Sequence, residues 1–105
     1  MVKLISSLPQ LKETLKANPK VILDFYADWC GPCQRISPIF VELAAKNSSI
    51  IFGKVNVDES EDLVSEFAVS SMPTFISFIN EKQNEKLIGG DQIKLAAMIE
   101  NLTKL

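Results

Sequence analysis

The chain has 105 residues, of which 47% are hydrophobic and 23% charged, with a formal net charge of −2 and no histidine. This length suits one domain whose core can form without disulfide support. The small negative charge gives no reason to expect a nucleic-acid or anionic-membrane partner. The lack of histidine excludes Ser-His and Cys-His hydrolase mechanisms and histidine-bound metals.

The first half of the chain is predicted to alternate strands and helices. A short strand over residues 2–5 precedes a helix that Ser7 can cap and that ends before Pro19. Residues 21–27 then form an apolar, buried strand, and residues 31–47 form a second helix with an apolar stripe.

The second half predicts fewer helices and a closing hairpin. Its expected elements are a strand over 50–57, a short helix that opens in the acidic residues 58–61 and ends at Phe67, a strand over 74–79, a polar turn over 80–85, a strand over 86–88, and a last helix capped by Asp91. Alternating strands and helices imply parallel pairs with right-handed crossovers. Helices then cover both faces, which predicts an α/β fold: a three-layer α/β/α sandwich with about five strands and four helices.

The stretch that joins the second strand to the second helix holds both cysteines. Cys30 and Cys33 flank Gly31 and Pro32 where the helix begins. Unpaired N–H groups and the positive end of the helix dipole lie there, so we expect the pKa of the Cys30 thiol below its free value. Residues three apart share a helix face, so Cys33 can form or resolve a disulfide with Cys30. A disulfide across so short a loop stabilises a fold little, which favours a redox role.

Two other uses of the cysteines stay open. A cysteine is commonly a small buried apolar residue with no reactivity. Structural zinc takes four ligands, so two sulfurs without histidine would need carboxylates or a second chain to complete the site. We expect no bound metal.

Asp24 interrupts a strand that otherwise predicts full burial. A buried carboxylate is costly, so it finds partners or keeps its proton with a raised pKa. The alternative, an acid on an exposed strand edge, conflicts with the apolar residues on both sides.

The sequence Trp29-Cys30-Gly31-Pro32-Cys33 resembles the active-site motif of the thioredoxin family. The resemblance covers essentially the whole chain and includes further matching residues: Asp24, Pro38, Met72-Pro73-Thr74 and Gly89-Gly90. It implies a single thioredoxin domain over residues 1–105, with a mixed sheet whose last two strands are antiparallel. It also implies a thiol–disulfide oxidoreductase, a protein-disulfide reductase that serves electron transport and cell redox homeostasis.

The resemblance implies a role for each residue near the cysteines. Cys30 would be the nucleophile, Cys33 the resolving nucleophile, and Asp24 the acceptor of the Cys33 proton. Gly31 and Pro32 would tune the reduction potential of the redox-active Cys30–Cys33 disulfide.

The resemblance also implies a substrate-docking patch, defined as Trp29, Met72, Pro73 and Gly89. Pro73 would follow a cis peptide bond, and the Met72 backbone would pair with an extended substrate segment. Gly89 would allow close approach on the other side.

Two further residues carry weaker expectations. Lys54 matches a position where some members carry a lysine near the buried acid, but a solvent-facing strand lysine fits equally well. Asp58 matches an acid that contacts the motif tryptophan in some relatives.

The resemblance names expected partners as well. No bound cofactor is expected, and electrons would come from NADPH through thioredoxin reductase. Peroxiredoxins, ribonucleotide reductase and methionine sulfoxide reductase would be the disulfide-containing substrates of a monomer. No nucleic-acid or membrane partner is expected.

The location rests on the sequence itself. Residues 1–7 lack the apolar stretch of a secretory signal, and no apolar run reaches the about 18 residues of a membrane span. Two cysteines are too few for a disulfide scaffold. We therefore expect a cytoplasmic protein, since thiols there are kept reduced. A transit peptide removed before the first residue stays open.

Two rival functions also stay open. One is an oxidase or isomerase of an oxidising compartment, against which the Gly-Pro pair and the missing signal argue. The other is a binding module in which the cysteines are incidental.

Overall fold

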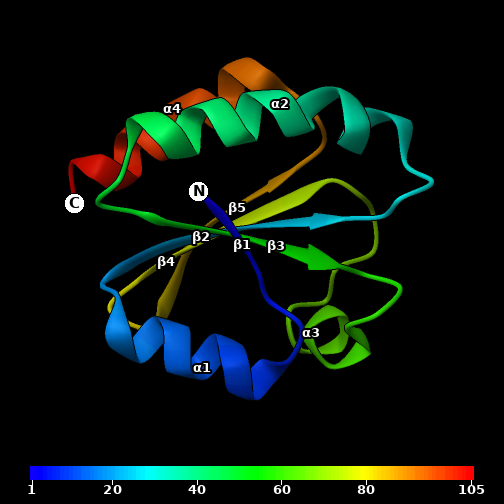
Figure 1. Cartoon of the computed structure of the whole chain (residues 1–105), viewed down its shortest axis with the longest axis horizontal. Coiled ribbons are helices and arrows are strands. Elements are labelled where there is room, and N and C mark those ends of the chain that lie inside the picture. Colours follow the sequence, from blue (N-terminus) through cyan, green and yellow to red (C-terminus); the bar gives the residue numbers. More distant parts are fainter.

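The computed structural model describes all residues from Met1 to Leu105 as five strands and four helices (Figure 1). In chain order the elements are β1 (Val2–Leu4), α1 (Leu8–Ala17), β2 (Lys20–Tyr26), α2 (Gly31–Lys46), β3 (Ile51–Asn56), α3 (Glu61–Glu66), β4 (Thr74–Ile79), β5 (Lys82–Ile88) and α4 (Gln92–Thr103). The strands form one mixed sheet in the order β1-β3-β2-β4-β5. β2 pairs in parallel with β3 and antiparallel with β4, and β4 and β5 are antiparallel. The predicted α/β fold is confirmed.

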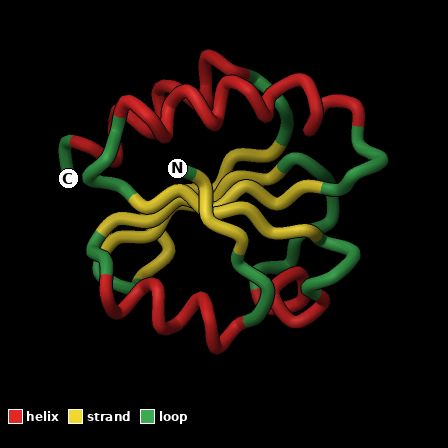
Figure 2. Tube along the Cα trace, viewed as in Figure 1, coloured by secondary structure: helices red, strands yellow, loops and turns green.

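The helices cover the two faces of the sheet in pairs. In Figures 1 and 2, α2 and α4 lie above the sheet, and α1 and α3 lie below it. Each face has its own hydrophobic cluster of 11 buried residues, because successive strand residues point to opposite faces. On β2, Leu23 and Phe25 face α1 and α3, whereas Ile22 faces α2 and α4. No helix combines the length and apolarity that crossing a bilayer requires.

Side chains cap the starts of the first and last helices, α1 and α4, as the sequence predicts. Ser7 Oγ accepts the Gln10 N–H at the start of α1 across 3.3 Å, and Asp91 Oδ1 accepts the Ile93 and Lys94 N–H groups at the start of α4. The Gln10 side chain departs from a capping box, because it accepts the N–H of Ser6 and not that of Ser7.

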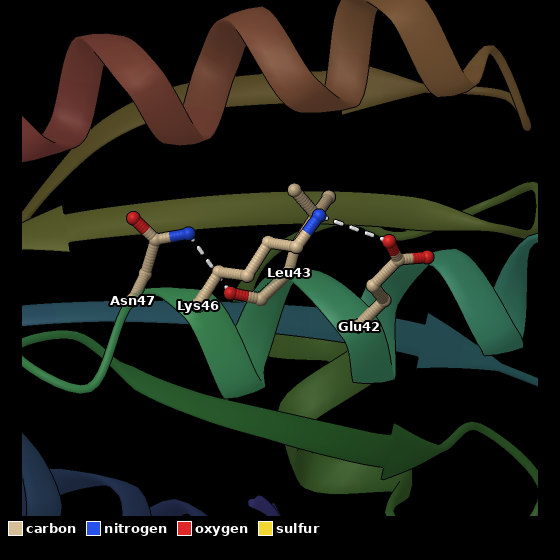
Figure 3. Close-up of polar contacts among 4 residues, drawn as sticks. All are labelled: Glu42, Leu43, Lys46 and Asn47. Carbon is tan, nitrogen blue, oxygen red and sulfur yellow. Dashed lines mark hydrogen bonds and ion pairs between the residues drawn. The ribbon is translucent and has the colours of Figure 1, made fainter.

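The last turn of α2 is closed by contacts that Figure 3 shows. Asn47 Nδ2 donates to the Leu43 carbonyl across 2.8 Å, which satisfies one of the carbonyls left free at a helix end. Lys46 pairs with Glu42 across 3.0 Å, one turn earlier on the exposed face. These contacts hold the end of α2 that lies far from the cysteines.

The closing hairpin differs from the sequence prediction. The prediction of a polar turn over 80–85 is wrong, because β5 already begins at Lys82 and only two residues form the turn. Asn80 and Glu81 both have positive φ, 49° and 74°, as a two-residue type I′ hairpin turn requires. The residues after the turn are polar because they lie on an edge strand, where exposed polar side chains discourage pairing with other chains.

Gly53 leaves space at a crowded point of β3, and its replacement tests that packing. A Cβ at Gly53 would lie 2.8 Å from Leu23 Cδ2 and 3.0 Å from Ile5 Cγ1, both fully buried. We expect Gly53→Ala to lower the free energy of unfolding by about 1–3 kcal/mol, measured by urea denaturation. At Gly90 a Cβ would meet nothing closer than 3.6 Å, so Gly90→Ala is the control. Equal stability of the two variants would contradict the packing described.

Candidate active site

Cys30 occupies the cap position of α2, directly after the turn that ends β2. The Cys30 N–H donates to the Ala27 carbonyl across 3.2 Å, which closes the turn. The Cys33 backbone N–H donates to Cys30 Sγ across 3.1 Å, so the sulfur accepts one of the free N–H groups of the first helical turn. Pro32 in that turn costs no hydrogen bond. A negative charge on this sulfur is therefore stabilised by both the hydrogen bond and the helix dipole.

Cys30 and Cys33 are joined by a disulfide, with their Cα atoms 5.3 Å apart. The exposed fractions of the two residues are only 6% and 3%. Cys30 Sγ also lies 3.7 Å from the Met72 carbonyl oxygen, within reach of an S–H donor in the reduced protein. With so little of Cys30 exposed, a disulfide in a partner protein reaches its sulfur only if that protein docks on the residues around it.

The Met72–Pro73 segment and the Gly89–Gly90 segment lie together beside the cysteines. The Met72–Pro73 peptide bond is cis, and the Gly89 N–H donates to the Pro73 carbonyl across 2.8 Å. A Cβ at Gly90 would lie in ordinary contact with its neighbours, 3.6 Å from Pro32 and 3.8 Å from Pro73. Gly89 has open space but a φ of +108°, so glycine is needed there for its backbone conformation.

Trp29 lies at the surface beside Cys30, with 68% of its surface exposed. Its indole Nε1 donates to Asp58 Oδ2 across 2.9 Å, which orients the ring. Three residues of the predicted site, Trp29, Met72 and Pro73, thus lie beside Cys30.

Asp24 is buried behind the cysteines, on the face of β2 that packs against α2. Only 5% of its surface is exposed, and its Oδ1 has no hydrogen-bond partner. Burial raises the pKa of Asp24 from 3.8 to about 7, although the positive charge of Lys54 lowers it in part. The prediction of a buried acid with a raised pKa agrees with this geometry.

A cavity of about 340 Å³ connects Asp24 with Cys33. Its other lining residues are Tyr26, Ala27, Asp28, Gln34, Ser37, Pro38 and Lys54. The cavity is large enough for several waters and has polar groups that could bind them.

Both interpretations that the sequence left open for Lys54 hold, a lysine near the buried acid and a solvent-facing strand lysine. It is the neighbour of Asp24 in the β2–β3 register and lines the cavity, yet its side chain is exposed. Its Nζ lies 5.8 Å from the centre of the Tyr26 ring and makes no direct ion pair with Asp24. The positive charge of Lys54 therefore lowers the pKa of Asp24 through space and not through a direct ion pair.

Residues that the sequence did not single out also line the site. Tyr26, Gln34 and Ser37 line the cavity. The helical spacing of Gln34 and Ser37 placed them on one side of α2, but which side faces β2 depends on the packing. No group of three or more acidic, cysteine or histidine side chains is placed to hold a metal ion.

The raised pKa of Asp24 makes a stability prediction. The unfolded chain loses this proton near pH 3.8, whereas the folded protein keeps it up to about pH 7, so stability falls as pH rises between those values. We expect Asp24→Asn to raise the free energy of unfolding by up to about 4 kcal/mol at about pH 8 and by little at about pH 4. Urea denaturation over this pH range measures the difference. Glu13→Gln, at an exposed acid, is the control; a pH-independent difference would contradict the raised pKa.

The thioredoxin family model matches residues 4–101. The thioredoxin of Mycoplasma pneumoniae is 43% identical over 89 residues, which make up 85% of this chain and 87% of that protein. The solved Plasmodium falciparum thioredoxin has a TM-score of 0.91 at 34% identity and covers 94% of this chain and 97% of its own. A chain from a structural study of the thiol resolving mechanism in yeast mitochondrial 1-Cys peroxiredoxin via glutathione/thioredoxin systems has a TM-score of 0.92 at 33% identity, over 96% and 95%. This chain therefore belongs to the thioredoxin family of thiol–disulfide oxidoreductases.

Proposed function

We propose that this member of the family reduces disulfides of partner proteins in the cytoplasm, through reversible dithiol–disulfide exchange at Cys30 and Cys33. The observation that carries the proposal is the Cys30 sulfur at the start of α2, where the Cys33 N–H donates to it across 3.1 Å. That environment stabilises a thiolate, which is the reactive form in disulfide exchange.

The reaction transfers two electrons in two exchange steps. The Cys30 thiolate attacks one sulfur of the partner's disulfide, so that a Cys30–partner bond forms, the partner's S–S bond breaks, and the released partner thiolate takes a proton from solvent. Cys33 then loses its proton and attacks the Cys30 sulfur. The mixed disulfide breaks, the second partner thiolate leaves, and the Cys30–Cys33 disulfide remains. The oxidised product of these steps is the disulfide form that the structure describes.

Asp24 is the proposed acceptor of the Cys33 proton. Its carboxyl is buried and has a pKa of about 7, so it can both accept and release a proton near neutral pH. The shared cavity supports a transfer through water, since both residues line it.

The remaining site residues are proposed to bind the partner and set the potential. Trp29, Met72, Pro73 and Gly89 form the docking patch, in which the Met72 backbone pairs with an extended segment of the partner. The fixed geometry of Gly31 and Pro32 between the cysteines tunes the reduction potential.

The partners are proposed by family membership. Thioredoxin reductase, drawing on NADPH, would return the disulfide to the dithiol, and the protein itself would act as a monomer of one domain without a bound cofactor. Peroxiredoxins, ribonucleotide reductase and methionine sulfoxide reductase are the proposed substrates. The similar chain from the yeast peroxiredoxin study supports the first of these.

Serine variants of the cysteines test the mechanism. Cys30→Ser removes the nucleophile and should abolish reduction of insulin disulfides. Cys33→Ser leaves the attack intact but prevents resolution, so it should accumulate mixed disulfides, detected by non-reducing electrophoresis and mass spectrometry. Multiple turnover by either variant would contradict the assigned roles.

Replacement of Asp24 tests the proton transfer. Asp24→Asn keeps the shape but cannot accept the proton, so the rate of reduction near pH 7 should fall at least about tenfold while the protein stays folded. The measurement is the pH–rate profile of a single turnover, in which the wild-type protein should show a step near pH 7 that the variant lacks. Glu13→Gln should keep the wild-type profile. An unchanged step in Asp24→Asn would remove Asp24 from the mechanism.

A further inference from the structure

Arg35 is a cation beside the cysteines that the proposed mechanism does not use. It lies on α2 four residues after Gly31, with an exposed side chain. Side chains on a helix lean toward its N-terminus, and here the lean carries the guanidinium over the first turn. A Cβ added to Gly31 would lie 3.4 Å from Arg35 Nη1. Because a Cβ is about 1.5 Å from its Cα, Nη1 lies within about 5 Å of the Gly31 Cα, one residue from the nucleophile.

The guanidinium of Arg35 has no partner within the protein. The two ion pairs of the chain join Lys46 to Glu42 and Lys104 to Glu100, and the neighbouring Gln34 has a backbone acceptor of its own at Asp28. Arg35 therefore keeps its planar set of N–H donors free. That geometry matches a carboxylate, which can accept two parallel hydrogen bonds from it.

The position of Arg35 adjoins the proposed docking patch. Gly31 leaves room for the guanidinium, and the next residue, Pro32, packs against Gly90 beside Pro73. The nearby acids lie outside α2: Asp28 precedes Cys30 by two residues and lines the cavity, and Asp58, which follows β3, is bound to Trp29. A partner segment that lies along the patch with its disulfide at Cys30 thus meets a free positive charge at Gly31.

We propose that Arg35 determines substrate preference by binding a carboxylate that the partner carries next to the disulfide cysteine attacked by Cys30. This rests on the proposed reductase function and adds a class of substrate to it, namely disulfides flanked by Asp or Glu. The Arg35 guanidinium is exposed to water in the free protein. Docking of the partner excludes water from it, so the ion pair between Arg35 and the partner's carboxylate strengthens on binding.

Disulfide peptides of one sequence, with Glu, Gln or Lys beside the attacked cysteine, test the preference. The second-order rate constant of their reduction is followed by Trp29 fluorescence at low salt. The wild-type protein should reduce the Glu peptide roughly three- to tenfold faster than the Gln peptide, and the ratio should fall as salt is added. Arg35→Met should remove the preference, and Arg35→Glu should reverse it in favour of the Lys peptide.

Two further variants separate the guanidinium from a general charge effect. Arg35→Lys keeps the charge without the planar fork and should retain only part of the preference. Lys12→Met removes one exposed charge on α1 and should behave as the wild-type protein.

The proposal would be overturned if the wild-type protein showed no preference for the Glu peptide, or if Arg35→Met reduced all three peptides more slowly by the same factor. It would also be overturned if Arg35→Met changed the Cys30–Cys33 reduction potential but left the Glu-to-Gln rate ratio unchanged. Failure of the proposed function is distinguishable from these, because the wild-type protein would then reduce neither the peptides nor insulin.

Discussion

The chemistry of this protein depends on one contact, the hydrogen bond from the Cys33 backbone N–H to the Cys30 sulfur. The contact exists because β2 ends and α2 begins within four residues, so that the sulfur replaces an ordinary cap side chain. The sheet and core hold that junction in place. β2 lies at the centre of the sheet, and Phe40 of α2 packs between Phe52 and Phe75 on the face that it covers. A shift of α2 would move the N–H away from the sulfur and lower the stability of a thiolate there.

The burial of Asp24 lowers the stability of the folded protein at neutral pH. Its carboxyl lies on the face of β2 that carries the core beneath α2, where an apolar residue would be more stable, and one of its oxygens has no partner. The same burial brings the pKa of Asp24 near neutrality, where a proton acceptor is most useful. A group that destabilises the folded state at neutral pH, yet lies on a cavity shared with Cys33, is easier to explain by function than by folding.

Much of the structure could be predicted from the sequence, because local patterns determine it. Caps such as Ser7 and Asp91, and the strand-to-helix change around Cys30, are read directly from neighbouring residues. The sequence predicts too short a strand for β5, because residues Lys82 to Glu85 lie on an edge strand and need no apolar pattern there. The contacts of Gly90 with Pro32 and Pro73, and the side of α2 that faces Asp24, depend on how distant segments pack. Arg35 went unnoticed because its nearness to Gly31 is a matter of side-chain direction.

The most direct test of this account is the reduction potential of the Cys30–Cys33 pair in the wild-type protein. It can be measured by equilibration with glutathione or dithiothreitol buffers and followed through Trp29, the only tryptophan in the chain. The account predicts a strongly reducing value near about −270 mV, the value established for thioredoxin itself. A value near about −180 mV, typical of disulfide isomerases, or higher would contradict the reductase function and indicate an oxidase or isomerase instead.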